Sequence, residues 1–162
     1  MKAFDTVPHE RLIHKLPGYG ISEEISKWIR SFLTGRRQKV VVNGEKSDWG
    51  KVTSGIPQGS ILGPLMFVLY INDLPNEIES SMLLFADDTK IFREIKSIKD
   101  QETLQSDVDA MCDWSSKWLL KYHPDKCKSM RLGLKDKDVF KYMLNGHTLD
   151  NTTKEKDKIK TN

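Results

Sequence analysis

The sequence predicts an α+β fold in a single unit, on three observations. Apolar residues recur at helical spacing in residues 22–35 and 99–121. The apolar run Val40-Val41-Val42 leads into Asn43-Gly44, a pair that favours a two-residue β-hairpin turn. Two further runs of strand character flank an acidic pair within residues 82–92, and no internal repeat or long linker divides the chain.

Two helices are expected in the first 35 residues. Pro8 opens a short amphipathic helix, which the Pro-Gly-Tyr-Gly stretch at 17–20 ends. Ser22 is a helix-capping residue type, and the helix after it runs to a stop at Gly35. The apolar side chains of this second helix are Ile25, Trp28, Ile29, Phe32 and Leu33.

A hairpin and a glycine-rich loop are expected next. Residues 40–53 predict two strands joined at Asn43-Gly44, with the return strand running to Thr53. Residues 54–60, Ser-Gly-Ile-Pro-Gln-Gly-Ser, then lead into an apolar helix. Glycine lets backbone approach a ligand closely, and amides at a helix N-terminus can face a phosphate or a base.

Asp87 and Asp88 lie where the two apolar runs of residues 82–92, MLLFADDTKIF, meet. One interpretation is a simple turn, because Asp caps the backbone of tight turns. The other is a cation site, because a divalent ion cancels the repulsion between two carboxylates and prefers oxygen ligands. The stretch alone does not decide between them.

The last third of the chain predicts one long helix, at about residues 99–121, and a strand near residues 130–132. Trp114 and Trp118 are one helical turn apart, which favours core anchors over platforms for base stacking. A polar tail, expected to be disordered, follows from Asn151.

Composition places the chain among globular proteins. It has 162 residues, of which 38% are hydrophobic and 30% charged. No apolar stretch is long enough to span a bilayer, no secretory signal opens the chain, and its two cysteines form no disulfide framework. We therefore expect an intracellular protein, with no signal separating nucleus from cytoplasm. The net charge of +3 permits contact with nucleic acid without arguing for it.

Four stretches carry a resemblance to a known family. In chain order they are KAFDTVPHERLIHKL, SGIPQGSILGPLMFVLYINDLP, FADD and WSSKWLLKYHPDKCKSM. Their order and spacing resemble the palm of reverse transcriptases from non-LTR retrotransposons of the jockey and CR1-like group. The resemblance runs from Lys2 to Leu149. It implies a polymerase palm-like α+β fold, an antiparallel sheet packed with helices and truncated at both ends, with the palm at 1–150 and the tail at 151–162.

The resemblance assigns the acidic pair to metal binding and catalysis. Asp87 is expected to be the stronger ligand of Mg²⁺ or Mn²⁺ and Asp88 its partner at the hairpin tip, together forming an incomplete metal site. Lys126 resembles the lysine that protonates the leaving pyrophosphate, a role that a compact cation can fill. The alternative for Lys126 is an ordinary exposed lysine after a Pro-Asp turn.

Three further residues are expected to contact the incoming nucleotide and the template pair. Phe4 matches the bulky residue beneath the sugar, which disfavours a 2′-hydroxyl. Gln58 and Gly59 match the loop beside the templating pair. The implied function is RNA-directed DNA polymerase, a nucleotidyltransferase, with an RNA template, a DNA primer and deoxynucleoside triphosphates as partners and no membrane.

Two departures from the family pattern concern the ends. In the pattern D-x-x-K-A-F-D the first aspartate falls two positions upstream of Met1, and the last is Asp5. Six residues along a strand span ~20 Å, so Asp5 is not expected to replace the missing ligand. We expect this chain alone to be inactive and prone to form oligomers or aggregates through an exposed sheet edge. The alternative function is a non-catalytic nucleic-acid-binding remnant of a retroelement.

Overall fold

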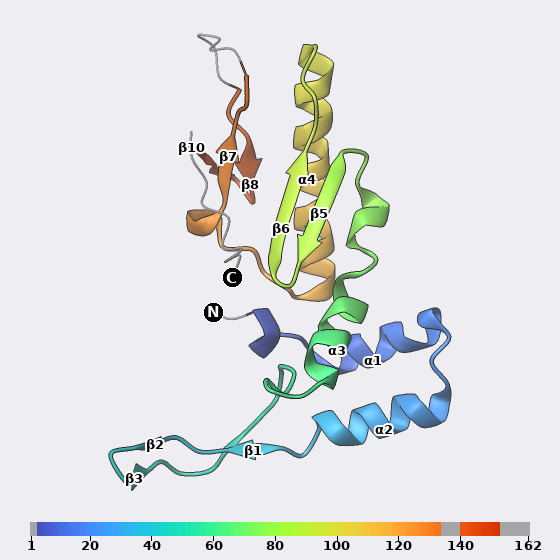
Figure 1. Ribbon diagram of the computed structural model, residues 1–162, viewed down its shortest axis with the longest axis vertical. Coiled ribbons are helices and arrows are strands. Elements are labelled where there is room, and N and C mark those ends of the chain that lie inside the picture. Colours follow the sequence, from blue (N-terminus) through green and yellow to red (C-terminus); the bar gives the residue numbers. More distant parts are fainter. Residues whose placement is uncertain (1–2, 134–139, 153–162) are drawn as a thin grey trace, which may run out of the picture.

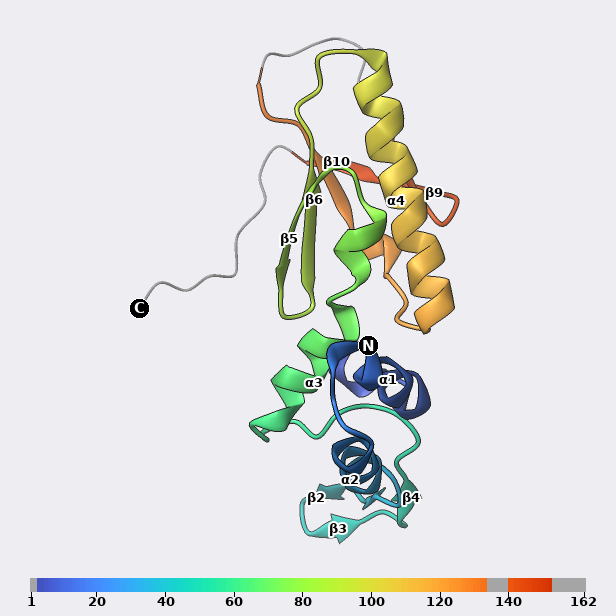
Figure 2. The ribbon, with the colours of Figure 1, turned by 90° about the vertical axis from the view of Figure 1, so that its right-hand side faces the viewer.

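The computed structural model describes residues 3–133 and 140–152, and it forms an elongated molecule with two halves (Figure 1). One half holds the first three α-helices and a projecting hairpin arm. The other holds a β-hairpin, the longest helix and the last short strands. The longest helix runs behind the hairpin in Figure 1 and beside it in Figure 2. The tip of the hairpin points toward the helical half.

The helical half contains η1, α1, η2, α2 and α3. Their bounds are Ala3–Asp5, His9–Lys15, Leu16–Tyr19, Glu23–Leu33 and Leu62–Ile71. Both expected early helices are confirmed, the first ending as a 3₁₀ turn that Gly20 closes in the left-handed conformation at φ 74°. Ser22 caps α2 by accepting a hydrogen bond from the amide of Ile25 at 3.3 Å.

The arm comprises four two-residue strands between α2 and the glycine-rich loop. They are β1 at Arg37–Gln38, β2 at Val41–Val42, β3 at Glu45–Lys46 and β4 at Gly50–Lys51. β1 pairs with β4 and β2 with β3, both antiparallel. The predicted turn is present, with Asn43 and Gly44 both at positive φ, and every residue from 37 to 51 is exposed.

The second half contains the remaining elements. These are η3 (Leu74–Glu77), β5 (Ser81–Phe85), β6 (Asp88–Phe92), α4 (Ile98–Trp118), η4 (Pro124–Lys126), β7 (Lys128–Met130), β8 (Met143–Leu144), β9 (His147–Thr148) and β10 (Asp150–Thr152). A capping box between Ser97 and Asp100 fixes the start of α4. Asn151 and Thr152, assigned above to the polar tail, lie in β10, and the rest of that tail is outside the described residues.

The α+β composition is confirmed, but the strands are more divided than the prediction of one antiparallel sheet. The described residues form five separate strand pairs, and one of them, β7 with β10, is parallel. The segment expected to continue as a strand around Phe4 is instead the 3₁₀ turn η1. Backbone hydrogen bonds hold this segment to the glycine-rich loop, so it does not pair with the β5–β6 hairpin.

A single main core joins the two halves. Its most buried side chains, each at most 1% exposed, are Val7, Leu12, Leu16, Leu33, Met66, Phe67 and Tyr70. Trp114 and the half-buried Trp118 belong to the same cluster, which confirms their prediction as core anchors. No helix in the described ranges has the length and apolar character needed to cross a bilayer.

Candidate nucleotide and metal site

The acidic pair lies at the turn of the β5–β6 hairpin. Phe85 pairs with Asp88, so Ala86 and Asp87 form a two-residue turn. Asp87 is thus in the turn itself, and Asp88 lies one position beyond it, at the start of β6. Both carboxylates are exposed. Ala86 adopts φ 51°, in the left-handed region where an alanine side chain is strained and Gly or Asn is usual.

A hollow of about 610 Å³ lies between this turn and the helical half. Ten residues line it: Ala3, Phe4, Pro57, Gln58, Gly59, Ser60, Ile61, Gly63, Pro64 and Asp87. They come from η1, from the glycine-rich loop with the start of α3, and from the hairpin turn. The structure therefore brings together four of the six predicted site residues, namely Phe4, Gln58, Gly59 and Asp87, from segments far apart in the sequence.

The glycine-rich loop is attached to the segment that carries Phe4. The amide of Gly55 donates to the carbonyl oxygen of Val7 at 2.8 Å, and that of Ile56 donates to the carbonyl oxygen of Phe4 at 2.9 Å. Gly55 adopts φ 87°, and a Cβ atom there would lie 2.7 Å from the carbonyl oxygen of Asp5. Glycine is therefore required where the loop crosses the segment that carries Phe4.

Asp5 has a different role from the one weighed in the sequence. Its carboxylate accepts a hydrogen bond from Nε2 of Gln58 at 2.7 Å, and its backbone oxygen accepts one from the Ser54 hydroxyl at 3.1 Å. The strand-based distance estimate for Asp5 does not apply, because η1 is a 3₁₀ turn. Asp5 does not line the hollow; it orients the side chain of Gln58, which does.

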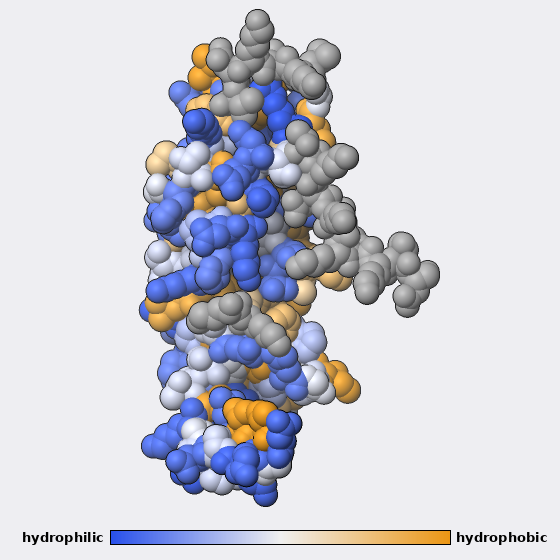
Figure 3. All heavy atoms as spheres, turned by 90° about the vertical axis from the view of Figure 1, so that its left-hand side faces the viewer, coloured by the Kyte–Doolittle hydropathy of each residue, from blue (hydrophilic) through white to orange (hydrophobic). Residues whose placement is uncertain are grey.

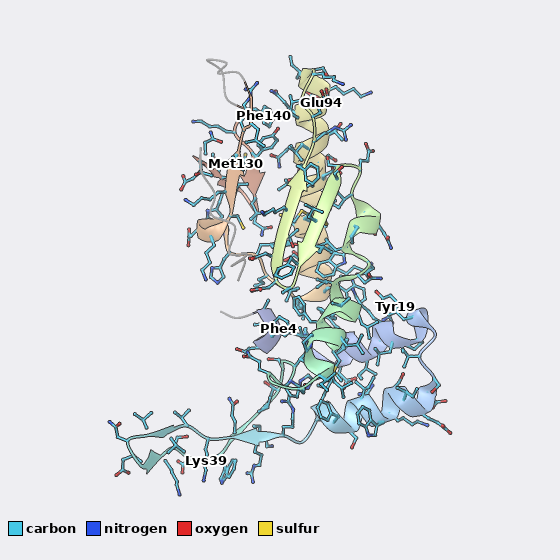
Figure 4. The ribbon with its side chains drawn as sticks, viewed as in Figure 1. Phe4, Tyr19, Lys39, Glu94, Met130 and Phe140 are labelled. Atoms are coloured by element: carbon cyan, nitrogen blue, oxygen red, sulfur yellow. The ribbon has the colours of Figure 1, made fainter. Side chains whose placement is uncertain are left out.

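Phe4 lies between the hairpin tip and α3, where Figure 4 labels it. Its ring stacks on that of Phe67, with the ring centroids 4.3 Å apart and the planes 16° apart. Phe67 is 1% exposed, so the core sets the position of Phe4 while part of Phe4 stays accessible to the hollow. A bulky side chain held this firmly can exclude groups from the space above it.

Further residues around the start of α3 complete the hollow, beyond those that the sequence predicts to contact the nucleotide. The Ser60 hydroxyl donates to the carbonyl oxygen of Pro57 at 2.9 Å and accepts from the amide of Gly63 at 3.0 Å. A Cβ atom at Gly63 would lie 2.7 Å from the same oxygen of Pro57. Ile61 stands on the rim, 95% exposed. The Gly-Pro step that interrupts the apolar run of α3 was the available signal for this geometry.

Lys126 is not in this group. It ends η4, it is exposed, and it does not line the hollow. Its backbone amide donates to the carbonyl oxygen of His123 at 3.0 Å, which closes the Pro-Asp-Lys turn. In this structure Lys126 has the surroundings of an ordinary surface lysine.

A buried lysine, Lys15, which local sequence did not reveal as buried, contacts the C-terminal end of α3. The Lys15 ammonium is 3.7 Å from the centroid of the Trp118 ring and also faces the rings of Tyr70 and Trp114. It donates to the carbonyl oxygen of Tyr70 at 2.6 Å and to the carboxylate of Asp73. Burial lowers the pKa of Lys15, and the hydrogen bond to Asp73 opposes that shift. Through these contacts Lys15 joins α1 to the C-terminal end of α3 and to α4.

Asp87 lines the hollow, whereas Asp88, its neighbour at the start of β6, does not. The described ranges contain no group of three or more His, Cys, Asp and Glu side chains placed to hold one metal ion. Asp87 and Asp88 are adjacent, exposed and oxygen-donating, which suits Mg²⁺ or Mn²⁺ because these ions accept one or two carboxylates and fill their remaining positions with water or phosphate oxygen. The residues present therefore fit one side of a divalent-cation site.

Comparison with known proteins places these features in a family. Residues 1–158 match the family described as reverse transcriptase (RNA-dependent DNA polymerase). The chain belongs to this family. Its relatives are encoded by non-LTR retrotransposons, and the family is one of nucleotidyltransferase enzymes.

Curated relatives cover most of this chain. It is 29% identical over 160 residues to the RNA-directed DNA polymerase from mobile element jockey of Drosophila funebris, covering 93% of this chain and 17% of that protein. It is 31% identical over 138 residues to the jockey polymerase of Drosophila melanogaster, covering 80% and 15%. A probable RNA-directed DNA polymerase from transposon BS of Drosophila melanogaster is 29% identical over 140 residues, covering 77% and 15%. The chain thus spans about a sixth of these relatives.

Proposed function

We propose that this chain is part of the palm of an RNA-directed DNA polymerase, which transfers deoxynucleotides to the 3′-hydroxyl of a primer on an RNA template. The observation that supports this most strongly is the hollow shared by Phe4, Gln58, Gly59 and Asp87. A family resemblance assigns these residues to one nucleotide site, and they come from three separate segments. A resemblance in sequence does not by itself require that such residues meet in space.

In this proposal Asp87 and Asp88 hold the divalent cation. When bound, the ion supplies Lewis acidity and charge neutralisation for phosphoryl transfer. The hairpin contributes by holding Asp87 in its turn, beside the hollow, and Asp88 directly after it at the start of β6. Since two carboxylates leave the coordination shell incomplete, we propose that the opposing carboxylate comes from polypeptide outside the described residues.

The other lining residues would orient the nucleotide. Phe4, backed by Phe67, would lie beneath the sugar and exclude a 2′-hydroxyl by steric contact. Gln58, held by the carboxylate of Asp5, would face the templating pair. Gly59 adopts φ 80°, and among the described residues none but its chain neighbours would come within 4 Å of a Cβ atom there, so this backbone leaves room for a base or sugar.

Lys126 is proposed as the general acid for the leaving pyrophosphate on the resemblance alone. Because Lys126 does not line the hollow here, this role requires η4 to approach the site when nucleic acid and nucleotide are bound. Lys126→Gln removes the charge and keeps a polar side chain. It distinguishes a general acid from an ordinary surface lysine. A rate of pyrophosphate release unaffected by this substitution identifies Lys126 as a surface lysine.

Primer extension tests the proposed function. The 162-residue chain and a longer polypeptide, which adds the upstream aspartate and flanking segments, are each given an RNA template, a labelled DNA primer and deoxynucleotides with Mg²⁺. We expect extension by the longer polypeptide and none by the shorter chain. Asp87→Ala should lower the rate of the longer polypeptide by about a thousandfold or more, because metal assistance contributes several kcal/mol to the barrier.

Two controls make this assay specific. Asp113→Ala removes an exposed aspartate of α4 that is remote in sequence from the hairpin, and it should leave the extension rate unchanged. Phe4→Ala should raise incorporation of ribonucleotides relative to deoxynucleotides. Extension by the 162-residue chain alone, abolished by Asp5→Ala, would overturn the placement of the opposing carboxylate outside the described residues and the role given to Asp5.

A further inference from the structure

The positive charge of this chain is concentrated on the arm. Residues 36–52 carry five cationic and two anionic side chains, so their net charge of +3 equals that of the whole chain. The arm extends away from the helical half (Figure 1), and Figure 4 labels Lys39 along it. In Figure 3 the arm faces the viewer at the lower end, where hydrophilic side chains surround an apolar patch. Val40, Val41 and Val42 are each more than half exposed there.

Three of these cations share one face with an aromatic ring. Arg37 lies directly opposite Lys51 in the β1–β4 pair. Like charges in opposing positions destabilise a strand pair. Lys39 follows Arg37 by two residues and Trp49 precedes Lys51 by two, so alternation places all four on the same face. The Lys39 ammonium, 4.8 Å from the centroid of the Trp49 ring, confirms that these two side chains meet.

The cations of this face have no carboxylate partner among the residues that the structure describes. Within the described ranges, no ion pair joins Arg37, Lys39 or Lys51 to an acidic side chain. Trp49 is 56% exposed, so its ring is not part of the core. The arm therefore keeps two like charges opposite each other and a large aromatic ring in solvent, both of which cost stability in the isolated chain. A ligand that carries negative charge and a flat apolar group would neutralise the opposed charges and cover the exposed ring.

A bulge between its two strand pairs also affects how the arm presents this face. Arg37 pairs with Lys51, whereas Val41 pairs with Lys46, so the return strand has one residue more than the outgoing strand. Such a bulge twists a strand pair and re-aims its side chains. At the base of the arm, the Arg36 guanidinium donates to the carbonyl oxygen of Gly55 at 2.7 Å. This bond ties the arm to the loop that lines the hollow.

From these features we infer that the face formed by Arg37, Lys39, Trp49 and Lys51 binds a single-stranded nucleic acid. The three cations contact successive phosphates, and Trp49 stacks on a base. This combination of a cationic track with an exposed ring is the usual one for single strands, whose bases are free to stack. The inference adds a strand-binding surface to the proposed polymerase, next in sequence to the loop of the nucleotide site.

Fluorescence anisotropy of a labelled single-stranded RNA oligonucleotide tests this surface on the 162-residue chain. The arm variant carries Arg37→Gln, Lys39→Gln and Lys51→Gln. The matched control carries Lys27→Gln, Lys96→Gln and Lys99→Gln, three exposed lysines elsewhere with the same total charge change. We expect the arm variant to lose affinity at least tenfold. Its slope of log affinity against log salt should be smaller by about 2, since each lost phosphate contact removes ~0.7. The control should stay within about twofold of the parent chain.

Trp49 distinguishes base stacking from simple charge attraction. Trp49→Ala should weaken binding about tenfold, and Trp49→Phe should recover most of that loss. Three outcomes overturn the inference: equal losses in the two charge variants, a preference for duplex with no effect of Trp49→Ala, or arm substitutions that alter self-association instead of RNA affinity. Binding is measured without nucleotide or metal, so failure here and failure of primer extension are read separately.

Discussion

The β2–β3 and β5–β6 hairpins each turn through two residues, but they use different residues in the turn. Asn43 and Gly44 adopt φ of 51° and 86°, as a tight hairpin favours, and Asn and Gly reach these values at little cost. In the β5–β6 hairpin Ala86 adopts φ 51°, which costs an alanine about 1–2 kcal/mol. The β8–β9 hairpin, with Asn145-Gly146, follows the first pattern.

The two hairpins also differ in how closely they pack against the core. One face of β5–β6 is half-buried, with Met82, Leu84 and Ile91 packed against the main core. The arm that holds β2–β3 is exposed along its whole length. The hairpin with the favourable turn thus stands without the core, and the hairpin with the strained turn is held by it. Strain beside two carboxylates is typical of a functional site, so we interpret the Ala86-Asp87 turn as selected for how it presents Asp87.

Truncating one side chain in each hairpin tests this difference in support. Leu84→Ala should lower the free energy of unfolding by about 2 kcal/mol, because it removes apolar contacts with the core. Val42→Ala should change it by less than about 0.5 kcal/mol, because Val42 is 60% exposed. Urea denaturation followed by circular dichroism measures both values. Similar losses in the two variants would mean that the arm is packed in solution.

Replacing Ala86 by Gly tests the strain in the turn. Ala86→Gly should raise the free energy of unfolding by about 0.5–1 kcal/mol, because glycine adopts positive φ without steric cost. The same substitution at Ala110, inside α4, is the control and should lower stability by about 1 kcal/mol. Thermal denaturation measures whether each substitution raises or lowers stability. A destabilising Ala86→Gly would show that the turn is not strained.

The exposed face of β5–β6 provides a smaller, concentration-dependent effect. Leu83, Phe85 and Phe92 are 59%, 72% and 51% exposed, so the strand pair presents an apolar face to solvent. We expect the 162-residue chain to self-associate, and Leu83→Lys to reduce this association. Val41→Lys on the arm should leave it unchanged. Sedimentation at several concentrations checks this, and a monomer at every concentration would contradict it.

Local patterns explain which elements the sequence predicted well. The helix beginning after Ser22 and the turn at Asn43-Gly44 depend on residues adjacent in the chain, and both lie where expected. The 3₁₀ turn at Phe4 was missed: Thr6 closes it locally by donating to the carbonyl oxygen of Ala3, and hydrogen bonds to residues about 50 positions away attach it to the glycine-rich loop. The burial of Lys15 was missed because its aromatic neighbours lie on α3 and α4.

The candidate site also combines residues that the sequence predicted with contacts that it could not predict. Phe4, Gln58, Gly59 and Asp87 were expected on family resemblance, and the structure brings them to one hollow. Spacing along the chain could not predict that Gln58 is held by Asp5, because the contact joins two loops that only the fold brings together. Spacing along the chain also could not show that Lys126 does not line the hollow, because the position of η4 depends on how the chain packs after α4.

The most direct test of the account is calorimetric titration of the 162-residue chain with Mg²⁺ and with Mn²⁺. If the β5–β6 turn presents Asp87 for metal binding, the parent chain should give a weak binding heat, since two carboxylates leave most of the ion's waters in place. Asp87→Asn, which keeps the shape and removes the charge, should abolish that heat, and Asp113→Asn should retain it. Equal heats from the parent chain and Asp87→Asn would contradict the assignment of this turn as the metal site.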